Sequence, residues 1–283
     1  MAVIDVVTYN GEADLFELRY NILKDYVDEF IVVEFDKTFS GKDKDWLFNQ
    51  KDNVQKYQYK DLGQGQSKVK SYFIYEKQWS KYLEMAENSP NTVGAEHWKR
   101  EFAQKESIKD CLTHLNDDDI VFIGDCDEVW NPEYPSLINE TGNLVAKLKL
   151  EVYTYWLNNK SDEEFWGTIV SKYKNIKDNC LNVLRTHRIS GSDDRVKGHY
   201  RTAFNEGWHF TSLKDGLRRK LEDSYTAESY ATPQILESLD KNIEENKDFL
   251  GRDFKYRLDE SNWPAYLKQN RSKYINLIKN ETT

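Results

Sequence analysis

The start of the chain alternates strand, helix and strand signals, and this order restricts the fold more than any other feature. Val3–Tyr9 is an apolar run rich in β-branched residues, which is typical of a buried strand. Glu12–Tyr26 places apolar side chains at helical spacing on one face, and Phe30–Val33 is a second apolar run. Two buried strands joined by a helix form a βαβ unit, in which the strands are parallel. We therefore expect a parallel α/β sheet at the start of the chain.

Later segments extend this sheet and then give way to helices. Further strands are expected at Val69–Tyr75, Ile120–Ile123, Leu144–Leu157, Thr168–Tyr173 and Leu181–Leu184. Helices are expected at Trp98–Leu115, Leu213–Ser224, Pro233–Phe249 and Trp263–Ile278, the last with Pro264 in its first turn. This order predicts an α/β domain over residues 1–211, followed by a helical extension over residues 212–283 that packs on it.

Net charge and cysteine content restrict the binding partners and the cellular compartment expected for the chain. Its 283 residues carry a formal net charge of −9, which argues against broad, nonspecific binding to nucleic-acid phosphates. No apolar run approaches the roughly 20 residues that span a bilayer, and the start shows no signal-peptide pattern, so no membrane contact is expected. The three cysteines lack zinc-binding spacing and fit a reducing compartment. We expect a cytoplasmic protein of a bacterial cell or a virus-infected host.

An acidic cluster directly after the apolar run Ile120–Ile123 is the strongest chemical signal. Asp125 and Asp127 are separated by one residue, and Glu128 follows. Ligands of open α/β sheets bind at the carboxyl ends of strands, an edge that both aspartates can reach. Mg²⁺ and Mn²⁺ take carboxylate oxygens together with substrate phosphates, and such an ion stabilises a leaving diphosphate. A solvated acidic turn is the alternative, but the position after a buried strand favours a Mn²⁺ or Mg²⁺ site.

Four blocks of sequence recur in the order and spacing of a known family. They read TYNGEADLFELRYNIL at 8–23, FIVVEFDKTFSGK at 30–42, DDDIVFIGDCDEVWNPE at 117–133 and EGWHFTSL at 206–213. In these blocks the chain resembles glycosyltransferase family 17, which contains the bisecting β-1,4-mannosyl-glycoprotein N-acetylglucosaminyltransferase and bacterial and viral relatives. The resemblance covers most of residues 3–225.

The resemblance implies a GT-A-like fold, with a nucleotide-binding α/β half and a mixed acceptor half. It also implies an inverting transfer to a glycan or another hydroxyl-bearing acceptor, with UDP-N-acetylglucosamine as the best-known donor. The matched position for the metal-binding acid is Asp127, with Asp125 beside it toward the ribose or the metal. His209 lies in the family's Gly-Trp-His block, and we expect it near the metal or the diphosphate, although a lone histidine is more often structural.

Several other residues are candidates for binding the donor. Those that follow the first strand sit at the same sheet edge and could hold uracil and ribose: Tyr9, Asn10 and Glu12. Capping of the next helix explains Glu12 equally well. Glu34 ends the second strand and has the same geometric argument. Arg100 and Lys105, on the helix before Ile120–Ile123, could meet the diphosphate, although a solvated helix face is the commoner role; Arg19 is expected to be structural.

An inverting transfer needs a general base that deprotonates the acceptor hydroxyl. The candidates are carboxylates in the middle of the chain: Asp162, Glu163, Glu164 and Glu151. A position in a surface loop is the alternative for each of them.

Two functions of other classes use the same acids. One is a metal-dependent phosphoester or pyrophosphate hydrolase, which usually needs a denser set of His and Asp ligands than a chain with five His offers. The other is a non-catalytic module that binds a sugar nucleotide, against which the intact Asp125 and Asp127 argue. Within the transferase class, modified DNA remains open as an acceptor, although the acidic charge weighs against nucleic acid.

Overall fold

The computed structural model describes residues 1–48, 68–88, 96–132, 145–186 and 206–280, and one mixed sheet organises this part of the chain. Its nine strands run in the order β3-β2-β1-β4-β7-β6-β8-β5, and β9 pairs with β7. The strands are β1 (Val3–Thr8), β2 (Glu29–Phe35), β3 (Val69–Ile74), β4 (Ile120–Asp125), β5 (Glu128–Trp130), β6 (Ala146–Thr154), β7 (Asn159–Lys172), β8 (Gly207–Thr211) and β9 (Tyr256–Leu258).

The first half of the sheet is parallel, as the opening βαβ pattern predicts. Helix α1 (Ala13–Leu23) connects β1 to β2, and β1 pairs in parallel with both β2 and β4. The register sets Thr8 beside Asp125, so the carboxyl ends of β1 and β4 meet at the same edge. The prediction of a parallel α/β start is confirmed.

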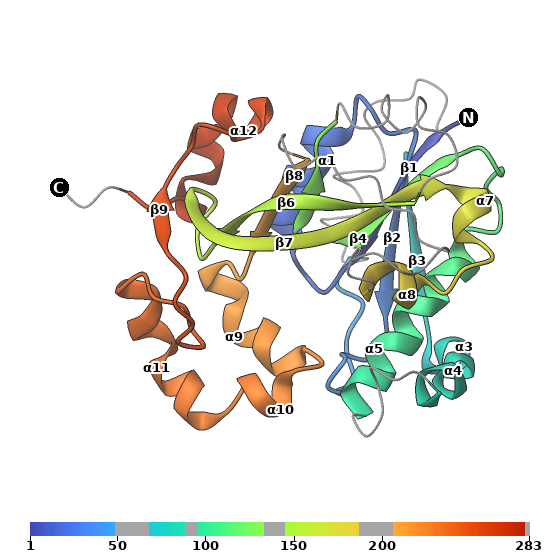
Figure 1. Cartoon of the computed structure of the whole chain (residues 1–283), viewed down its shortest axis with the longest axis horizontal. Coiled ribbons are helices and arrows are strands. Elements are labelled where there is room, and N and C mark those ends of the chain that lie inside the picture. The colour runs from blue at the N-terminus through green and yellow to red at the C-terminus, as the bar shows by residue number, and fades with distance from the viewer. Residues whose placement is uncertain (49–67, 89–95, 133–144, 187–205, 281–283) are drawn as a thin grey trace.

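The second half of the sheet is mixed. Strand β7 runs antiparallel to β4 and β6, whereas β8 pairs in parallel with β6 and antiparallel with β5. Figure 1 shows β6 and β7 as long, curved strands that extend the sheet away from the parallel half. A parallel half joined to a mixed half is the arrangement expected of a GT-A-like fold.

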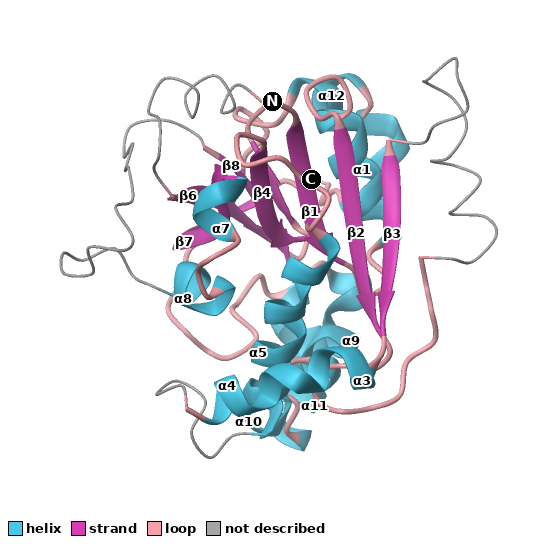
Figure 2. Ribbon diagram, turned by 90° about the vertical axis from the view of Figure 1, so that its right-hand side faces the viewer, coloured by secondary structure: helices cyan, strands magenta, loops and turns pink. Residues whose placement is uncertain are grey.

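Helices cover both faces of the sheet because successive strand residues alternate between two apolar clusters. One cluster joins Val7 and Phe122 to helices α1 and α12 (Ala265–Gln269), which lie side by side (Figure 2). The other joins Val6 and Ile123 to α5 (Glu96–Ser107) and α8 (Leu181–Thr186). Three short helices complete the described part of this region: α3 (Glu76–Trp79), α4 (Leu83–Glu87) and α7 (Tyr173–Ile176).

Several expected elements differ from those observed. The strand predicted at Leu181–Leu184 is wrong. These residues belong to helix α8, and the two leucines, three residues apart, face the core from it. Helix α5 ends at Ser107 and continues as a 3-10 turn. The expected helix Trp263–Ile278 is interrupted at Asn270, between α12 and a 3-10 segment, and Pro264 is the N-cap of α12.

The C-terminal part of the chain packs on the sheet in two places. Helices α9 (Lys214–Asp223) and α11 (Pro233–Glu244) enclose a third apolar cluster with Tyr155 and Trp156, and α10 (Ala227–Tyr230) lies between them (Figure 1). Helix α12 instead joins the cluster that contains α1. A domain boundary at residue 211 stays a prediction. Among the described residues, none of the helices is both long and apolar enough to cross a membrane.

Candidate active site

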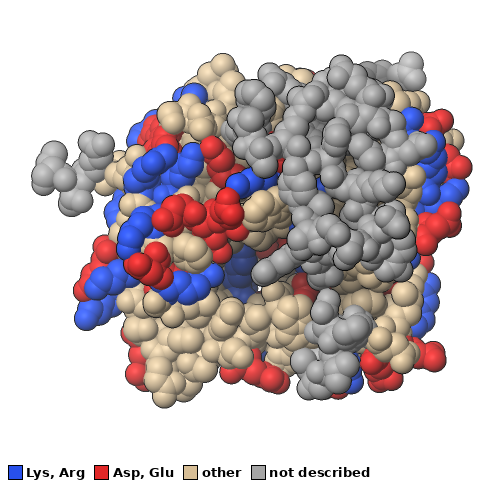
Figure 3. Space-filling model, viewed as in Figure 1, with Lys and Arg blue, Asp and Glu red and all other residues tan. Residues whose placement is uncertain are grey.

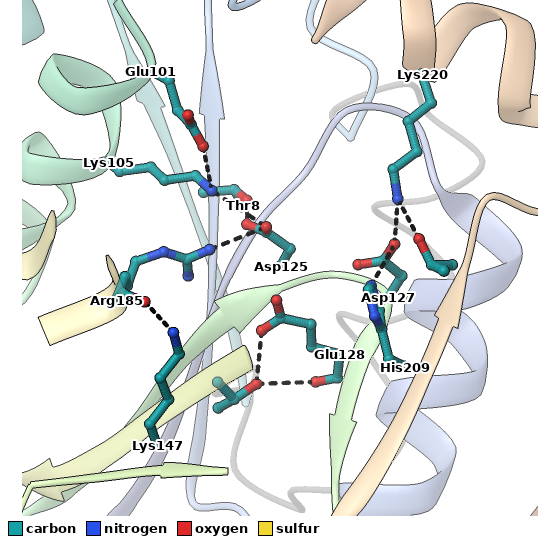
Figure 4. A network of polar contacts seen from close by, with 12 residues as sticks. Thr8, Glu101, Lys105, Asp125, Asp127, Glu128, Lys147, Arg185, His209 and Lys220 are labelled. Atoms are coloured by element: carbon teal, nitrogen blue, oxygen red, sulfur yellow. Dashed lines mark hydrogen bonds and ion pairs between the residues drawn. The ribbon is translucent and has the colours of Figure 1, made fainter. Parts of the chain in front are cut away.

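The turn between β4 and β5 carries the acidic cluster, and its first aspartate is surrounded by cations. The Asp125 carboxylate accepts a hydrogen bond from the Thr8 hydroxyl, 2.9 Å away. Its other oxygen lies 3.2 Å from Lys105 Nζ and 3.1 Å from Arg185 Nη2 (Figure 4). Burial alone would raise the pKa of Asp125, but the charges of Arg185 and Lys105 hold it well below its usual range. Asp125 is therefore a fixed negative charge.

The second aspartate, Asp127, contacts a different set of residues. Its Oδ2 lies 2.6 Å from Lys220 Nζ and 3.5 Å from His209 Nε2, on the opposite side of the turn from the Asp125 cations (Figure 4). Burial would raise the pKa of Asp127, but Lys220 and His209 lower it well below its usual range. Lys220 also donates to Thr211 Oγ1 over 2.8 Å, which links α9 to β8.

A buried arginine fixes the turn between β4 and β5. Arg19 on α1 donates to both carboxylate oxygens of Asp5 on β1, over 2.7 and 2.6 Å. Its Nη1 donates to the main-chain oxygens of Asp125 and Glu128, at the two ends of the turn. Trp130 adds a 2.7 Å hydrogen bond to Asp5. Arg19 is structural, as expected, and it fixes the backbone that carries both aspartates.

A cavity of about 230 Å³ opens beside the turn. Figure 3 shows a hollow near the middle of the molecule, with Lys or Arg side chains at depth. The walls of the cavity come from the ends of β1 and β2, helix α5, the turn after β4, and helix α9 with the residues that follow it. Six predicted site residues line this cavity together: Tyr9, Asn10, Glu12, Lys105, Asp125 and Asp127.

Three other predicted residues lie near this site without lining the cavity. His209 on β8 contacts Asp127 and stacks on Phe165, with ring centroids 3.9 Å apart. The buried Glu34 accepts the main-chain N–H groups of Leu47 and Phe48, over 2.7 and 3.0 Å, and so fixes the loop after β2. Arg100 donates to the main-chain oxygen of Phe39 in that same loop, over 2.6 Å.

The four predicted base candidates lie on β6 and β7 and do not line the cavity. Three are paired with cations: Glu151 with Lys160 at 2.8 Å, Glu163 with Arg252 at 3.5 Å and Glu164 with Lys149 at 2.5 Å. Asp162 accepts the main-chain N–H of Lys255 over 2.9 Å. These four acids therefore lie outside the cavity that Asp125 and Asp127 line.

Three residues that contact the aspartates were absent from the sequence prediction. Thr8 could have been found, because parallel pairing of β1 and β4 brings the two strand ends into register. Arg185 and Lys220 gave no local signal, since each is one basic residue on a helix far from the acidic cluster in sequence.

The donor atoms at this site suit a hard cation only in part. Among the described residues, no group of three or more His, Cys, Asp or Glu is arranged to hold a metal ion. Asp127 and His209 offer a carboxylate oxygen, which Mn²⁺ and Mg²⁺ prefer, close to an imidazole nitrogen, which these ions take less readily, and substrate oxygens would complete the shell. The Asp125 oxygens already contact Thr8, Lys105 and Arg185. Asp127 pairs with one lysine, Lys220, whereas Asp125 pairs with Lys105 and Arg185, so the residues fit a metal held by Asp127 and His209 better than one held by both aspartates.

The model of the family described as glycosyltransferase family 17 matches residues 1–190. No curated protein matches the sequence. The chain is similar to two solved structures of the galactosyltransferase LgtC, one in complex with donor and acceptor sugar analogs and one of an active-site mutant. Each is 12% identical with a TM-score of 0.33, and the matches cover 63% and 65% of this chain. The chain spans only 60% and 61% of those two proteins.

Proposed function

We propose that this chain, which belongs to glycosyltransferase family 17, transfers a sugar from a UDP-sugar to a hydroxyl of an acceptor. The observation that carries the proposal is the cavity at the carboxyl ends of β1 and β4, lined by Asp125 and Asp127 together with Lys105 and Lys220. Ligands of α/β sheets bind at this edge. Acids that can hold a cation, together with lysines that can contact phosphate, match the charge pattern of a nucleoside diphosphate.

The donor would lie along the end of β1. Tyr9, Asn10 and Glu12 line the same cavity as the two aspartates, so one ligand can contact both sets. We propose that the uracil and ribose contact Tyr9 and Asn10 and that Asp125 lies toward the ribose. The transferred sugar is proposed to be N-acetylglucosamine, and the transfer to be inverting, because the family resemblance implies both. The acceptor would be a glycan or another hydroxyl compound rather than nucleic acid, given the net charge of −9.

Asp127 and His209 would hold a Mn²⁺ or Mg²⁺ ion against the diphosphate. When bound, the ion neutralises charge that develops on the leaving diphosphate. Lys220, now 2.6 Å from Asp127, would release that carboxylate and turn its ammonium group toward a phosphate oxygen. Lys105 and Arg185 keep Asp125 ionised and in place. The charges around Asp125 are thus arranged in advance, as in preorganised sites that stabilise a transition state, whereas Lys220 moves when the donor binds.

The place of the reaction is part of the proposal. We propose that the chain works in the cytoplasm, where a UDP-sugar would reach the cavity without crossing a bilayer. The support is the cysteine content, with Cys111 and Cys126 buried as free thiols and Cys180 half-buried.

The test is Asp127→Asn, which keeps the shape of the side chain and removes its charge. Transfer is measured as UDP release across a Mn²⁺ titration, after the melting temperature without ligand is shown to be unchanged. We expect turnover to fall about a hundredfold or more, because Lewis-acid stabilisation contributes several kcal/mol. Asp118→Asn is the matched control, since Asp118 is exposed and pairs with Lys172 at the other end of β4. Full transfer by Asp127→Asn, or wild-type transfer that EDTA leaves unchanged, would contradict the proposal.

A further inference from the structure

The carboxylates that line the cavity differ in whether a cation neutralises them. Five acidic residues line it among the described part of the chain: Glu12, Glu101, Asp125, Asp127 and Asp223. Four of them form ion pairs: Glu101 with Lys105 at 2.9 Å, Asp125 with Arg185 at 3.1 Å, Asp127 with Lys220 at 2.6 Å and Asp223 with Lys42 at 3.5 Å. Each of these four carboxylates already has a cation as its partner, which leaves it less available to an acceptor hydroxyl.

Glu12 is the exception. Within the described residues its carboxylate forms no ion pair, and the hydrogen bond that it receives comes from the main-chain N–H of Asn10, over 2.6 Å. Glu12 is the N-cap of α1, yet its side chain makes no hydrogen bond to the first turn of that helix. The capping role that the sequence allows is therefore not the one that Glu12 performs. Its carboxylate lines the cavity instead.

The Glu12 carboxylate lies in the same cavity as Asp125 and Asp127, where the donor is proposed to bind. The main-chain oxygen of Glu12 lies 4.0 Å from Cys126 Sγ, so the residue is packed against the turn that carries Asp125 and Asp127. Burial raises the pKa of Glu12, although the Asn10 hydrogen bond and the charge of Lys220 oppose this. A half-buried carboxylate with increased proton affinity, beside the diphosphate site, has the properties that a general base needs.

We infer that Glu12 is the general base of the transfer, in place of the four acids on β6 and β7. This inference rests on the proposed function. The Glu12 carboxylate accepts the proton of the acceptor hydroxyl while the acceptor oxygen bonds to the anomeric carbon of the donor sugar. The bond between that carbon and the diphosphate oxygen breaks, and its electron pair leaves with UDP. Glu12 returns its proton to water after the products leave.

The experiment compares Glu12→Gln with Asp14→Asn. The first change keeps an oxygen that can accept the Asn10 hydrogen bond but removes the basic group. The second removes an exposed acid from the first turn of the same helix, outside the cavity. For each variant we measure the melting temperature, the affinity for UDP-sugar by calorimetry, and kcat and KM for transfer.

We expect Glu12→Gln to lower kcat about 10²- to 10⁴-fold, the usual effect of losing a general base, with donor affinity and melting temperature close to wild type. Asp14→Asn should transfer at the wild-type rate. Near-normal kcat in Glu12→Gln would overturn the inference, as would a loss confined to donor affinity, which would make Glu12 a donor ligand.

The same assays on Glu151→Gln, Asp162→Asn, Glu163→Gln and Glu164→Gln test the alternative. A comparable fall of kcat in one of these variants, with Glu12→Gln active, would assign the base to β6 or β7. Whether the base is Glu12 or an acid on β6 or β7, transfer by the wild-type protein shows that the proposed function itself stands. A wild-type protein that binds no UDP-sugar and transfers no sugar would overturn the proposed function and, with it, the role of Glu12.

Discussion

Replacing Arg19 by Met tests how the backbone of the acidic turn is held. The Arg19 and Asp5 side chains are both fully buried, and two hydrogen bonds of 2.7 and 2.6 Å join them. Met has a similar length and no charge, so the variant fills much of the same space. It leaves Asp5 buried with Trp130 as its donor, and it removes the donor from the main-chain oxygens of Asp125 and Glu128.

The loss of stability in Arg19→Met follows from the Asp5 charge that stays buried without its cation. Breaking a buried ion pair by removing one partner lowers the free energy of unfolding by about 3–5 kcal/mol. A chain of this size loses about 2–4 °C of melting temperature per kcal/mol, so a fall on the order of 10 °C is expected. Because the turn also loses the donor at both of its ends, we expect transfer to fall even at temperatures where the variant is folded.

Urea denaturation of four proteins measures this effect: wild type, Arg19→Met, Asp5→Asn and the double variant. Asp5→Asn keeps an oxygen for Trp130, so the double variant should lose about 0.5–3 kcal/mol less than the sum of the single changes. Arg257→Met is the matched control, since Arg257 is exposed and pairs with Asp259. An unchanged denaturation midpoint in Arg19→Met, or strictly additive effects, would refute the role assigned to Arg19.

Two further predictions concern the C-terminal part of the chain. Lys220→Met removes the cation 2.6 Å from Asp127, so Mn²⁺ should bind the nucleotide-free protein more tightly and UDP-sugar should bind more weakly; calorimetry that gives wild-type affinities for both would contradict this. Asp248 is buried, and although burial would raise its pKa, its bonds to Arg252 and to main-chain N–H groups lower it. The stability that Asp248 contributes is therefore present above its unfolded pKa of about 3.9 and is lost as the pH falls through the lower folded value. Asp248→Asn should melt at a lower temperature at pH 7 and lose less stability on acidification; an unchanged melting profile against pH would be the contrary result.

The parts of the fold that the sequence predicts are those set by local patterns. Strands β1, β2 and β4 are apolar runs because both of their faces are buried, and α1 has an apolar face because one side packs on the sheet. The position of Asp125 and Asp127 follows from the end of β4. Short segments are harder to assign from sequence. The mostly apolar segment Leu181–Leu184 fits a strand or a helix until α5 is known to pack against it.

The parts of the site that the sequence does not predict depend on contacts between distant segments. Residues 162–164 are acidic and were predicted as general-base candidates, with a surface loop as the alternative, but they belong to β7 and do not line the cavity. Lys220 reaches Asp127 from α9, and Arg185 reaches Asp125 from α8. No local pattern distinguishes these two basic residues from others on a solvated helix. The role of Glu12 likewise depends on which cavity acids are neutralised, which only the assembled cavity reveals.

The most direct test of the central claim is calorimetric titration of the protein with UDP, GDP, CMP and UDP-N-acetylglucosamine in the presence of Mn²⁺. The account predicts that UDP binds more tightly than GDP or CMP, that UDP-N-acetylglucosamine binds, and that Asp127→Asn weakens this binding strongly. Tighter binding of GDP or CMP would contradict the assigned donor. Failure of every nucleotide to bind the wild-type protein would contradict the claim that the cavity beside Asp125 and Asp127 is a sugar-nucleotide site.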